Sequence, residues 1–129
     1  MNESDVKRKM VESVKSCGGY ARRIEDQYAV GVFDTMFIPK GLPVIFAEVK
    51  IVRGTTFGPT PRQLIELDRV KYATANTGHA IPIIIGYKDG VYYFHHPMPA
   101  VDIKECFSVT TSDMEFHDQL VQYFHSRRK

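Results

Sequence analysis

The chain has 129 residues, a length that suits a single domain, because compact domains typically have ~100–200 residues. Its 43% hydrophobic residues, 25% charged residues and net charge of +2 exclude a polybasic DNA-coating protein and leave room for a local basic patch. The chain has two cysteines and no apolar run near the ~18–20 residues of a membrane span, which argues against a disulfide framework, a cysteine-rich zinc site or a membrane partner. We therefore expect one intracellular, cytoplasmic domain over residues 1–129, without a signal peptide.

The first segment, residues 2–17, predicts a helix. Apolar side chains recur at helical spacing from Val6 to Cys17, and two glycines then end the pattern. Glu3 falls on the same stripe of the helix as these apolar residues. An acid is thus expected on the inward face, where an acid needs a partner.

Three strands are expected next, at residues 20–24, 31–38 and 44–52, from their content of β-branched and aromatic residues. The turn at residues 39–41 makes the second and third strands antiparallel neighbours. The third strand is apolar on both faces, which is typical of a central strand covered on both sides. The glycine-containing loop at residues 53–59 is expected to be mobile.

The second half of the chain predicts a helix, a hairpin and a final helix. Thr60, Pro61 and Gln63 carry the start signals of a helix that Gly78 ends. The later elements are expected at residues 80–87 (strand), 91–95 (strand) and 112–126 (helix), with an Asp89-Gly90 turn joining the two strands.

The order of these elements predicts an α/β fold. The strand at residues 44–52, the helix from Thr60 and the strand at residues 80–87 should form a right-handed parallel crossover. We expect a mixed β-sheet flanked by helices, with an α-β-β-β-α-β core, a further strand and a terminal helix. The core would span about residues 2–96.

Three charged residues, Asp34, Glu48 and Lys50, stand in strands that otherwise read as buried. Buried charge is costly unless it is paired or bound to a metal ion, and neighbouring carboxylates repel each other. A divalent cation such as Mg²⁺ or Mn²⁺ removes this conflict and suits oxygen ligands. Metal-assisted hydrolysis of a phosphodiester is one interpretation, and a buried ion-pair network is an equal alternative.

Further candidates have ordinary structural interpretations. Gln63 fits a capping box with Thr60, which would occupy its side chain at the start of the helix. Contacts with DNA phosphate are a minor possibility for arginines that are otherwise solvated, namely Arg22, Arg23, Arg53 and Arg62. The five histidines are interpreted as non-catalytic, because tandem His95-His96 points to both faces of a strand and His79 and His117 lack ligand spacing.

Motifs in the first two thirds of the chain resemble the PD-(D/E)XK nuclease superfamily and, more narrowly, stand-alone virus-type VRR-NUC domains. The resemblance covers roughly residues 2–87. In chain order it consists of ESDVKRKMVESV with Glu3, GYARRI, GVFD ending at Asp34, AEVK ending at Lys50, and TPRQ ending at Gln63. Phe33 departs from the pattern, because the family usually has proline at this position.

The resemblance implies a restriction-endonuclease-like fold and a Mg²⁺- or Mn²⁺-dependent DNA endonuclease. In that family the residues matching Asp34 and Glu48 are metal ligands, helped by the carbonyl of Val49. The family role of Lys50 is that of catalytic lysine. Glu3 would assist a second metal ion or a water molecule, and Gln63 would support the site from the start of its helix.

The resemblance also implies the biological setting of the protein. Branched, flap or junction DNA is the expected substrate, and a phage-encoded homodimer formed through the terminal hairpin and last helix is the expected assembly. A Holliday-junction resolvase-type dimer is one alternative. Others are a catalytically silent nucleic-acid-binding module on a nuclease scaffold, and a structural or partner-binding domain whose charges form an internal network.

Overall fold

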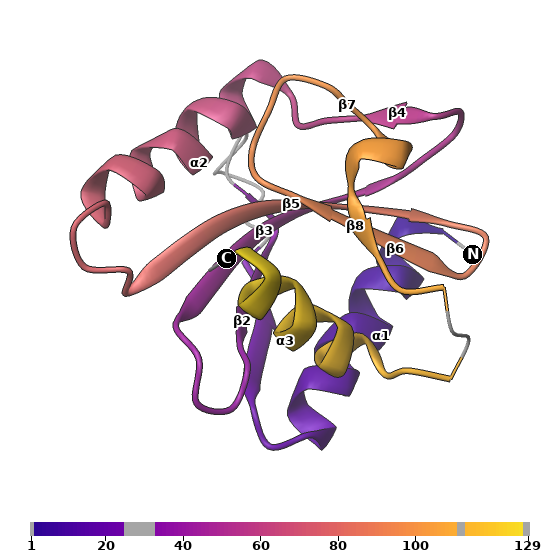
Figure 1. Cartoon of the computed structure of the whole chain (residues 1–129), viewed down its shortest axis with the longest axis horizontal. Helices are drawn as coiled ribbons and strands as arrows, with labels where there is room; N and C mark the ends of the chain where they lie inside the picture. Colours follow the sequence, from indigo (N-terminus) through magenta and orange to yellow (C-terminus); the bar gives the residue numbers. More distant parts are fainter. Residues whose placement is uncertain (1, 25–32, 111–112, 128–129) are drawn as a thin grey trace.

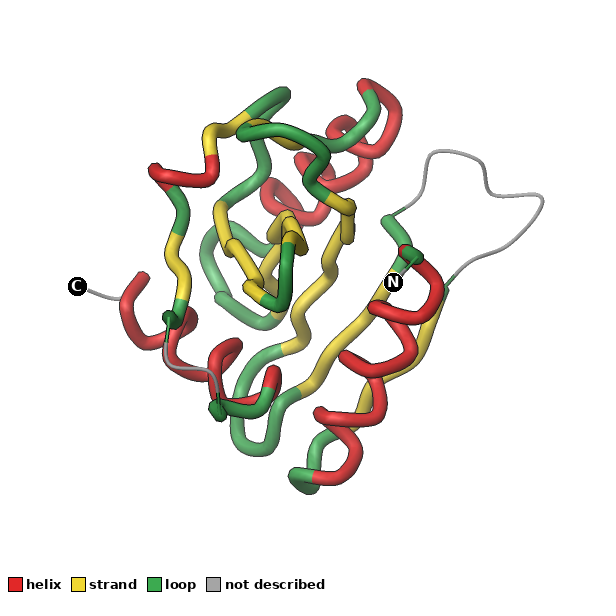
Figure 2. Tube along the Cα trace, turned by 90° about the vertical axis from the view of Figure 1, so that its right-hand side faces the viewer, coloured by secondary structure: helices red, strands yellow, loops and turns green. Residues whose placement is uncertain are grey.

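The computed structural model describes residues 2–24, 33–110 and 113–127. Helices α1 (Glu3–Ser16) and α3 (Phe116–Arg127) lie on one face of a six-stranded sheet (Figure 1). Helix α2 (Pro61–Ala73) lies on the opposite face. Figure 2, turned by 90°, shows α1 running alongside the strands that it contacts. The expected mixed sheet flanked by helices is therefore confirmed.

The sheet is mostly antiparallel, with one parallel pair at its centre. Its strands, in spatial order, are β1 (Tyr20–Arg23), β2 (Thr35–Ile38), β3 (Val44–Ile51), β5 (Ala80–Lys88), β6 (Val91–His95) and β8 (Phe107–Ser108). Strand β3 is antiparallel to β2 and parallel to β5, and α2 lies between β3 and β5 in the chain. The antiparallel pairing of β2 with β3 and the parallel pairing of β3 with β5 are thus as expected.

The turn at Asp89-Gly90 has the predicted hairpin conformation. Both residues have positive φ, at 50° for Asp89 and 83° for Gly90, as the favoured two-residue turn requires. The turn joins β5 to β6 and fixes Tyr87 opposite Tyr92.

Each face of the sheet has its own apolar core. On the α1 and α3 side, Met10 and Leu120 pack with inward residues of β3 and β5. On the α2 side, Leu67 packs with Ile84 and with Phe57. Because both faces of β3 are covered, the Glu48 side chain in the middle of this strand is buried, whereas Lys50 near its end is partly exposed.

The segment expected to be a mobile loop, residues 53–59, is ordered by a small second sheet. Strand β4 (Thr56–Phe57) pairs with β7 (Val101–Asp102), and Phe57 is buried. A Cβ atom at Gly86 would lie 2.8 Å from the ring of Phe57, so glycine allows this close packing. Two-residue strands such as β4, β7 and β8 carry too few residues for an alternating pattern, which is why the sequence did not predict them.

Several predicted boundaries are wrong. Helix α2 ends at Ala73 rather than running to Gly78, and the hydroxyl of its C-cap residue Thr74 donates to the carbonyls of Val70 and Ala80. The side chain of Tyr72, in the last turn of α2, is 79% exposed. Helix α3 begins at Phe116, and the predicted start at Ser112 lies outside the described residues.

The start of the strand expected at residues 31–38 also falls partly outside the described residues, and β2 begins at Thr35. A short 3₁₀ helix, η1 (Ile103–Glu105), was not expected. Across residues 2–24, 33–110 and 113–127, none of the helices is both long and apolar enough to cross a membrane.

Candidate metal and nucleic-acid site

The acidic pair lies where β2 begins beside β3. Asp34 directly precedes β2 rather than standing inside it, but its backbone continues the ladder, since its N–H donates to the Ala47 carbonyl at 3.2 Å. Glu48 lies within β3. The two residues are 6% and 1% exposed. The expectation that two acids are buried on adjacent strands is therefore met.

Every oxygen of the Asp34 carboxylate has a partner within the protein. Oδ2 lies 2.7 Å from Nζ of Lys7 and accepts a hydrogen bond from the backbone N–H of Val49 at 3.3 Å. Oδ1 accepts a hydrogen bond from the Thr35 hydroxyl at 2.8 Å. Asp34 thus makes one ion pair and two hydrogen bonds within the protein.

Glu48 is less well satisfied. Its Oε2 lies 3.1 Å from Nζ of Lys50, but no hydrogen bond to Oε1 is found among the described residues. Burial, followed by the neighbouring charge of Asp34, raises the pKa of the Glu48 carboxyl to about 8, although Lys50 acts in the opposite direction. In the absence of a metal ion, burial and the charge of Asp34 thus favour the protonated form of this carboxyl.

A divalent cation fits this pair. Two buried carboxylates on adjacent strands are hard oxygen ligands, and one of their oxygens, Oε1 of Glu48, is buried without a hydrogen-bond partner among the described residues. A cation bound there would satisfy that oxygen and reduce the repulsion between Glu48 and Asp34. The contact seen for Val49 uses its N–H group, and a role for its carbonyl stays a prediction.

Lys7 is the functional candidate that sequence reasoning missed. It lies on α1, is only 7% exposed, and makes an ion pair with Asp34, the residue just before β2. Its Nζ also lies 3.7 Å from Oε2 of Glu3. Glu3, whose side chain is 41% exposed, therefore reaches the acidic pair through Lys7. A signal existed in the sequence, because Lys7 follows Glu3 by one helical turn on the inward stripe.

Gln63 caps its own helix. Its Oε1 accepts a hydrogen bond from the Thr60 N–H at 2.9 Å, and its N–H donates to the Thr60 hydroxyl at 3.2 Å. The predicted capping box is therefore confirmed. Helix α2 does cover the face of the sheet that carries Ile84, the register partner of Glu48.

The predicted DNA-contacting arginines differ in how free their side chains are. Arg22 is exposed, whereas Arg23 is half-buried and donates to the Ser4 hydroxyl at 3.1 Å. Arg53 and Arg62 are both exposed, near the start of β4 and at the start of α2. Three of the four are thus solvated as expected and Arg23 is not, and contact with DNA stays a prediction for all four.

Comparisons with known proteins identify the fold. No family model matches the sequence, and no curated protein matches it either. Among solved structures, the chain is similar to Hjc of Archaeoglobus fulgidus, a Holliday junction resolvase from an archaeal hyperthermophile. The two share 11% sequence identity with a TM-score of 0.60, over 82% of this chain and 90% of the other. At this identity the likeness defines architecture, and the chain has the restriction-endonuclease-like α/β fold.

Proposed function

We propose that this protein is a metal-dependent DNA endonuclease of the PD-(D/E)XK superfamily, related to the stand-alone VRR-NUC domains. The observation that carries the proposal is the burial of Asp34 and Glu48 on adjacent strands, with the Lys50 ammonium 3.1 Å from Glu48. The fold shared with an archaeal resolvase supports it. So does the order of the sequence motifs from Glu3 to Gln63.

In this proposal each charged group has a separate task. Asp34 and Glu48 would hold Mg²⁺ or Mn²⁺, which when bound polarises the phosphate and lowers the pKa of water. The Lys50 side chain, 27% exposed, would extend from the buried pair toward the substrate. Its ammonium would orient the attacking water or stabilise the charge that develops on the phosphate. Lys7 would be a positioning residue that holds the Asp34 carboxylate.

The proposed substrate is branched or junction DNA. The similar solved structure is described as a Holliday junction resolvase, and a net charge of only +2 favours selective over indiscriminate binding. Arg22, Arg53 and Arg62 are exposed and available to contact phosphates. A homodimer would double this small basic surface, with the β5–β6 hairpin and α3 as the proposed interface. A phage source and action inside the host cell follow from the VRR-NUC resemblance and belong to this proposal.

A second candidate is a catalytically silent DNA-binding module on the same scaffold. One observation favours it: Asp34 is fully satisfied by Lys7, Val49 and Thr35 without a metal ion. The raised pKa of Glu48 also favours a neutral carboxyl beside Asp34, which lowers the need for a cation to separate the two groups. The buried and unpartnered Oε1 of Glu48 argues for the nuclease instead.

A cleavage panel separates the two functions. Linear, nicked, flap and four-way-junction DNA would be incubated with the wild-type protein, with and without Mg²⁺ or Mn²⁺. Glu48→Gln and Lys50→Ala would be compared with Glu12→Gln and Lys9→Ala, which alter exposed residues of α1. The proposal expects metal-dependent cleavage that is lost in the first two variants and retained in the controls. Cleavage by Glu48→Gln and Lys50→Ala at the wild-type rate would overturn the proposal. A wild-type protein that binds junction DNA, but neither cleaves it nor binds Mn²⁺, would favour the silent module.

A further inference from the structure

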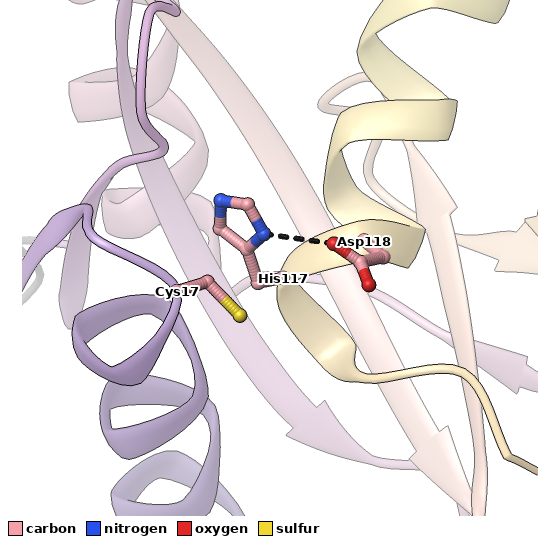
Figure 3. Close-up of side chains that lie close together, drawn as sticks. All are labelled: Cys17, His117 and Asp118. Atoms are coloured by element: carbon pink, nitrogen blue, oxygen red, sulfur yellow. Dashed lines mark hydrogen bonds and ion pairs between the residues drawn. The ribbon is translucent and has the colours of Figure 1, made fainter.

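A second group of ligand-type side chains lies where the first and last helices meet. Cys17 caps the C-terminal end of α1, and His117 and Asp118 lie in the first turn of α3 (Figure 3). One ligand atom from each residue lies within 4.8 Å of the other two. The cluster lies at the opposite end of α1 from Glu3 and Lys7, and it is separate from the acidic pair.

The backbone that carries this cluster is fixed by hydrogen bonds. The Ser13 hydroxyl donates to Oε2 of Glu115 at 2.7 Å and accepts from the N–H of His117 at 3.1 Å. The N–H of Cys17 in turn donates to the Ser13 carbonyl at 3.2 Å. Ser13 therefore anchors both chain segments, although they are about a hundred residues apart in the sequence. A ligand site assembled there would need little reorganisation of the backbone.

The imidazole of His117 is only 10% exposed, and its Nδ1 lies 3.0 Å from Oδ1 of Asp118. No hydrogen bond to the other ring nitrogen, Nε2, is found among the described residues. Nδ1 is therefore the ring nitrogen that faces Asp118, and Nε2 is left to carry the ring's proton when Nδ1 binds an ion. Asp118, with its side chain 59% exposed, opens the cluster to solvent, so an ion can reach it.

The donor set matches a borderline-soft cation. Thiolate sulfur, imidazole nitrogen and carboxylate oxygen are the ligands of zinc, and three protein ligands leave one tetrahedral position for water. Bonds of ~2.0 Å in a tetrahedron place nitrogen and oxygen ligands ~3.3 Å apart. The separation of 3.0 Å between Nδ1 and Oδ1 is close to that value. A cation bound to both would take the place of the proton they share.

We propose that Cys17, His117 and Asp118 form a binding site for Zn²⁺ or a cation of similar chemistry, which joins α1 to α3. Binding through Nδ1 would release the thiol proton of Cys17 to the solvent, and the neutral imidazole of His117 would carry its one ring proton on Nε2. The joined helix is the one that carries Lys7, so the ion would stabilise the support of the acidic pair without contacting it. The two sites differ in chemistry, because the acidic pair offers only hard oxygen ligands.

Cobalt substitution tests the site, since a thiolate bound to Co²⁺ gives a charge-transfer absorption band. The metal-free full-length protein would be titrated with Co²⁺ and then with Zn²⁺. We expect a band that saturates at one equivalent and disappears when Zn²⁺ displaces the cobalt. Cys17→Ser should abolish the band, and Asp118→Asn should weaken Co²⁺ binding by at least ~10-fold. Both changes are at accessible positions, so folding should be retained.

The other cysteine supplies the matched control. Cys106 is also a free thiol, and it lies after η1, away from the cluster. Cys106→Ser should keep the band, and so should Glu48→Gln, which alters only the proposed nuclease site. Absence of a band in the wild-type protein, or a band that survives Cys17→Ser and is lost in Cys106→Ser, would overturn the proposal. A wild-type protein that shows the band but cleaves none of the DNA substrates would count against the proposed function alone.

Discussion

Helices α1 and α2 cover opposite faces of the same sheet, yet their side chains relate to the acidic pair in different ways. Lys7 of α1 makes an ion pair with Asp34 at 2.7 Å. Gln63 of α2, the residue that the family pattern singles out, turns back onto Thr60 and closes its own helix. The difference teaches that a residue with a role in the family pattern does not always make the expected contact, whereas an inward-facing lysine without such a role can make one.

The strand between the two helices is where the largest effect is expected. If Glu48 and Lys50 of β3 act in the reaction, Glu48→Gln and Lys50→Ala should each reduce cleavage of the preferred DNA by ~100-fold or more. Losses of this size are typical when one group that stabilises a transition state is removed. Single-turnover cleavage rates would measure this. Lys9→Ala on the exposed side of α1 should stay within a few-fold of the wild-type rate. Equal losses in all three variants would point to unfolding or weaker DNA binding.

Removing the α1 contact should mainly affect stability. Lys7→Met leaves the Asp34 carboxylate buried without its ion pair, so the free energy of unfolding of the metal-free protein should fall by ~3–5 kcal/mol. Mn²⁺ should restore part of this loss, because a cation again compensates Asp34. Urea denaturation with and without Mn²⁺ measures both effects, with Lys9→Met as the matched control. A variant as stable as the wild type would show that the Lys7–Asp34 pair contributes nothing.

The protonation of Glu48 predicts how the stability of the metal-free protein changes with pH. Because its pKa is about 8 in the folded chain and 4.5 for a glutamate side chain exposed to water, the folded state binds more protons between these pH values. The free energy of unfolding should therefore fall as pH rises from about 4.5 to about 8, by at most ~1.4 kcal/mol per pH unit. Glu48→Gln should flatten this slope in denaturation curves taken across the range. An identical slope in the variant would assign the dependence to other groups.

The smallest effect on stability and cleavage is expected for substitutions at the start of α2. These substitutions test whether Gln63 only caps its helix or also supports the reaction. If Gln63 only caps the helix, Gln63→Ala and Thr60→Ala should each cost ~0.5–2 kcal/mol of stability and leave cleavage within a few-fold of wild type. Thermal denaturation and cleavage assays on both variants measure this. A much larger loss of cleavage in Gln63→Ala than in Thr60→Ala would restore the role that the family pattern implies.

Sequence alone determined the features that depend on residues close together in the chain. The capping box at Thr60, the hairpin at Asp89-Gly90 and the antiparallel pair around residues 39–41 each follow from a few adjacent residues with restricted backbone geometry. Asp34 and Glu48 could be identified because charge in an otherwise apolar strand is costly and therefore conspicuous.

Only the tertiary structure decided which distant groups meet. The Lys7–Asp34 ion pair and the Cys17–His117 cluster join residues with no shared local pattern, and the packing of α1 against the sheet and against α3 creates both. The protonation of Glu48 is decided in the same way, since it depends on burial and on a charge from a neighbouring strand. Contacts of this kind come from the burial of apolar faces, which brings polar groups together irrespective of their separation along the chain.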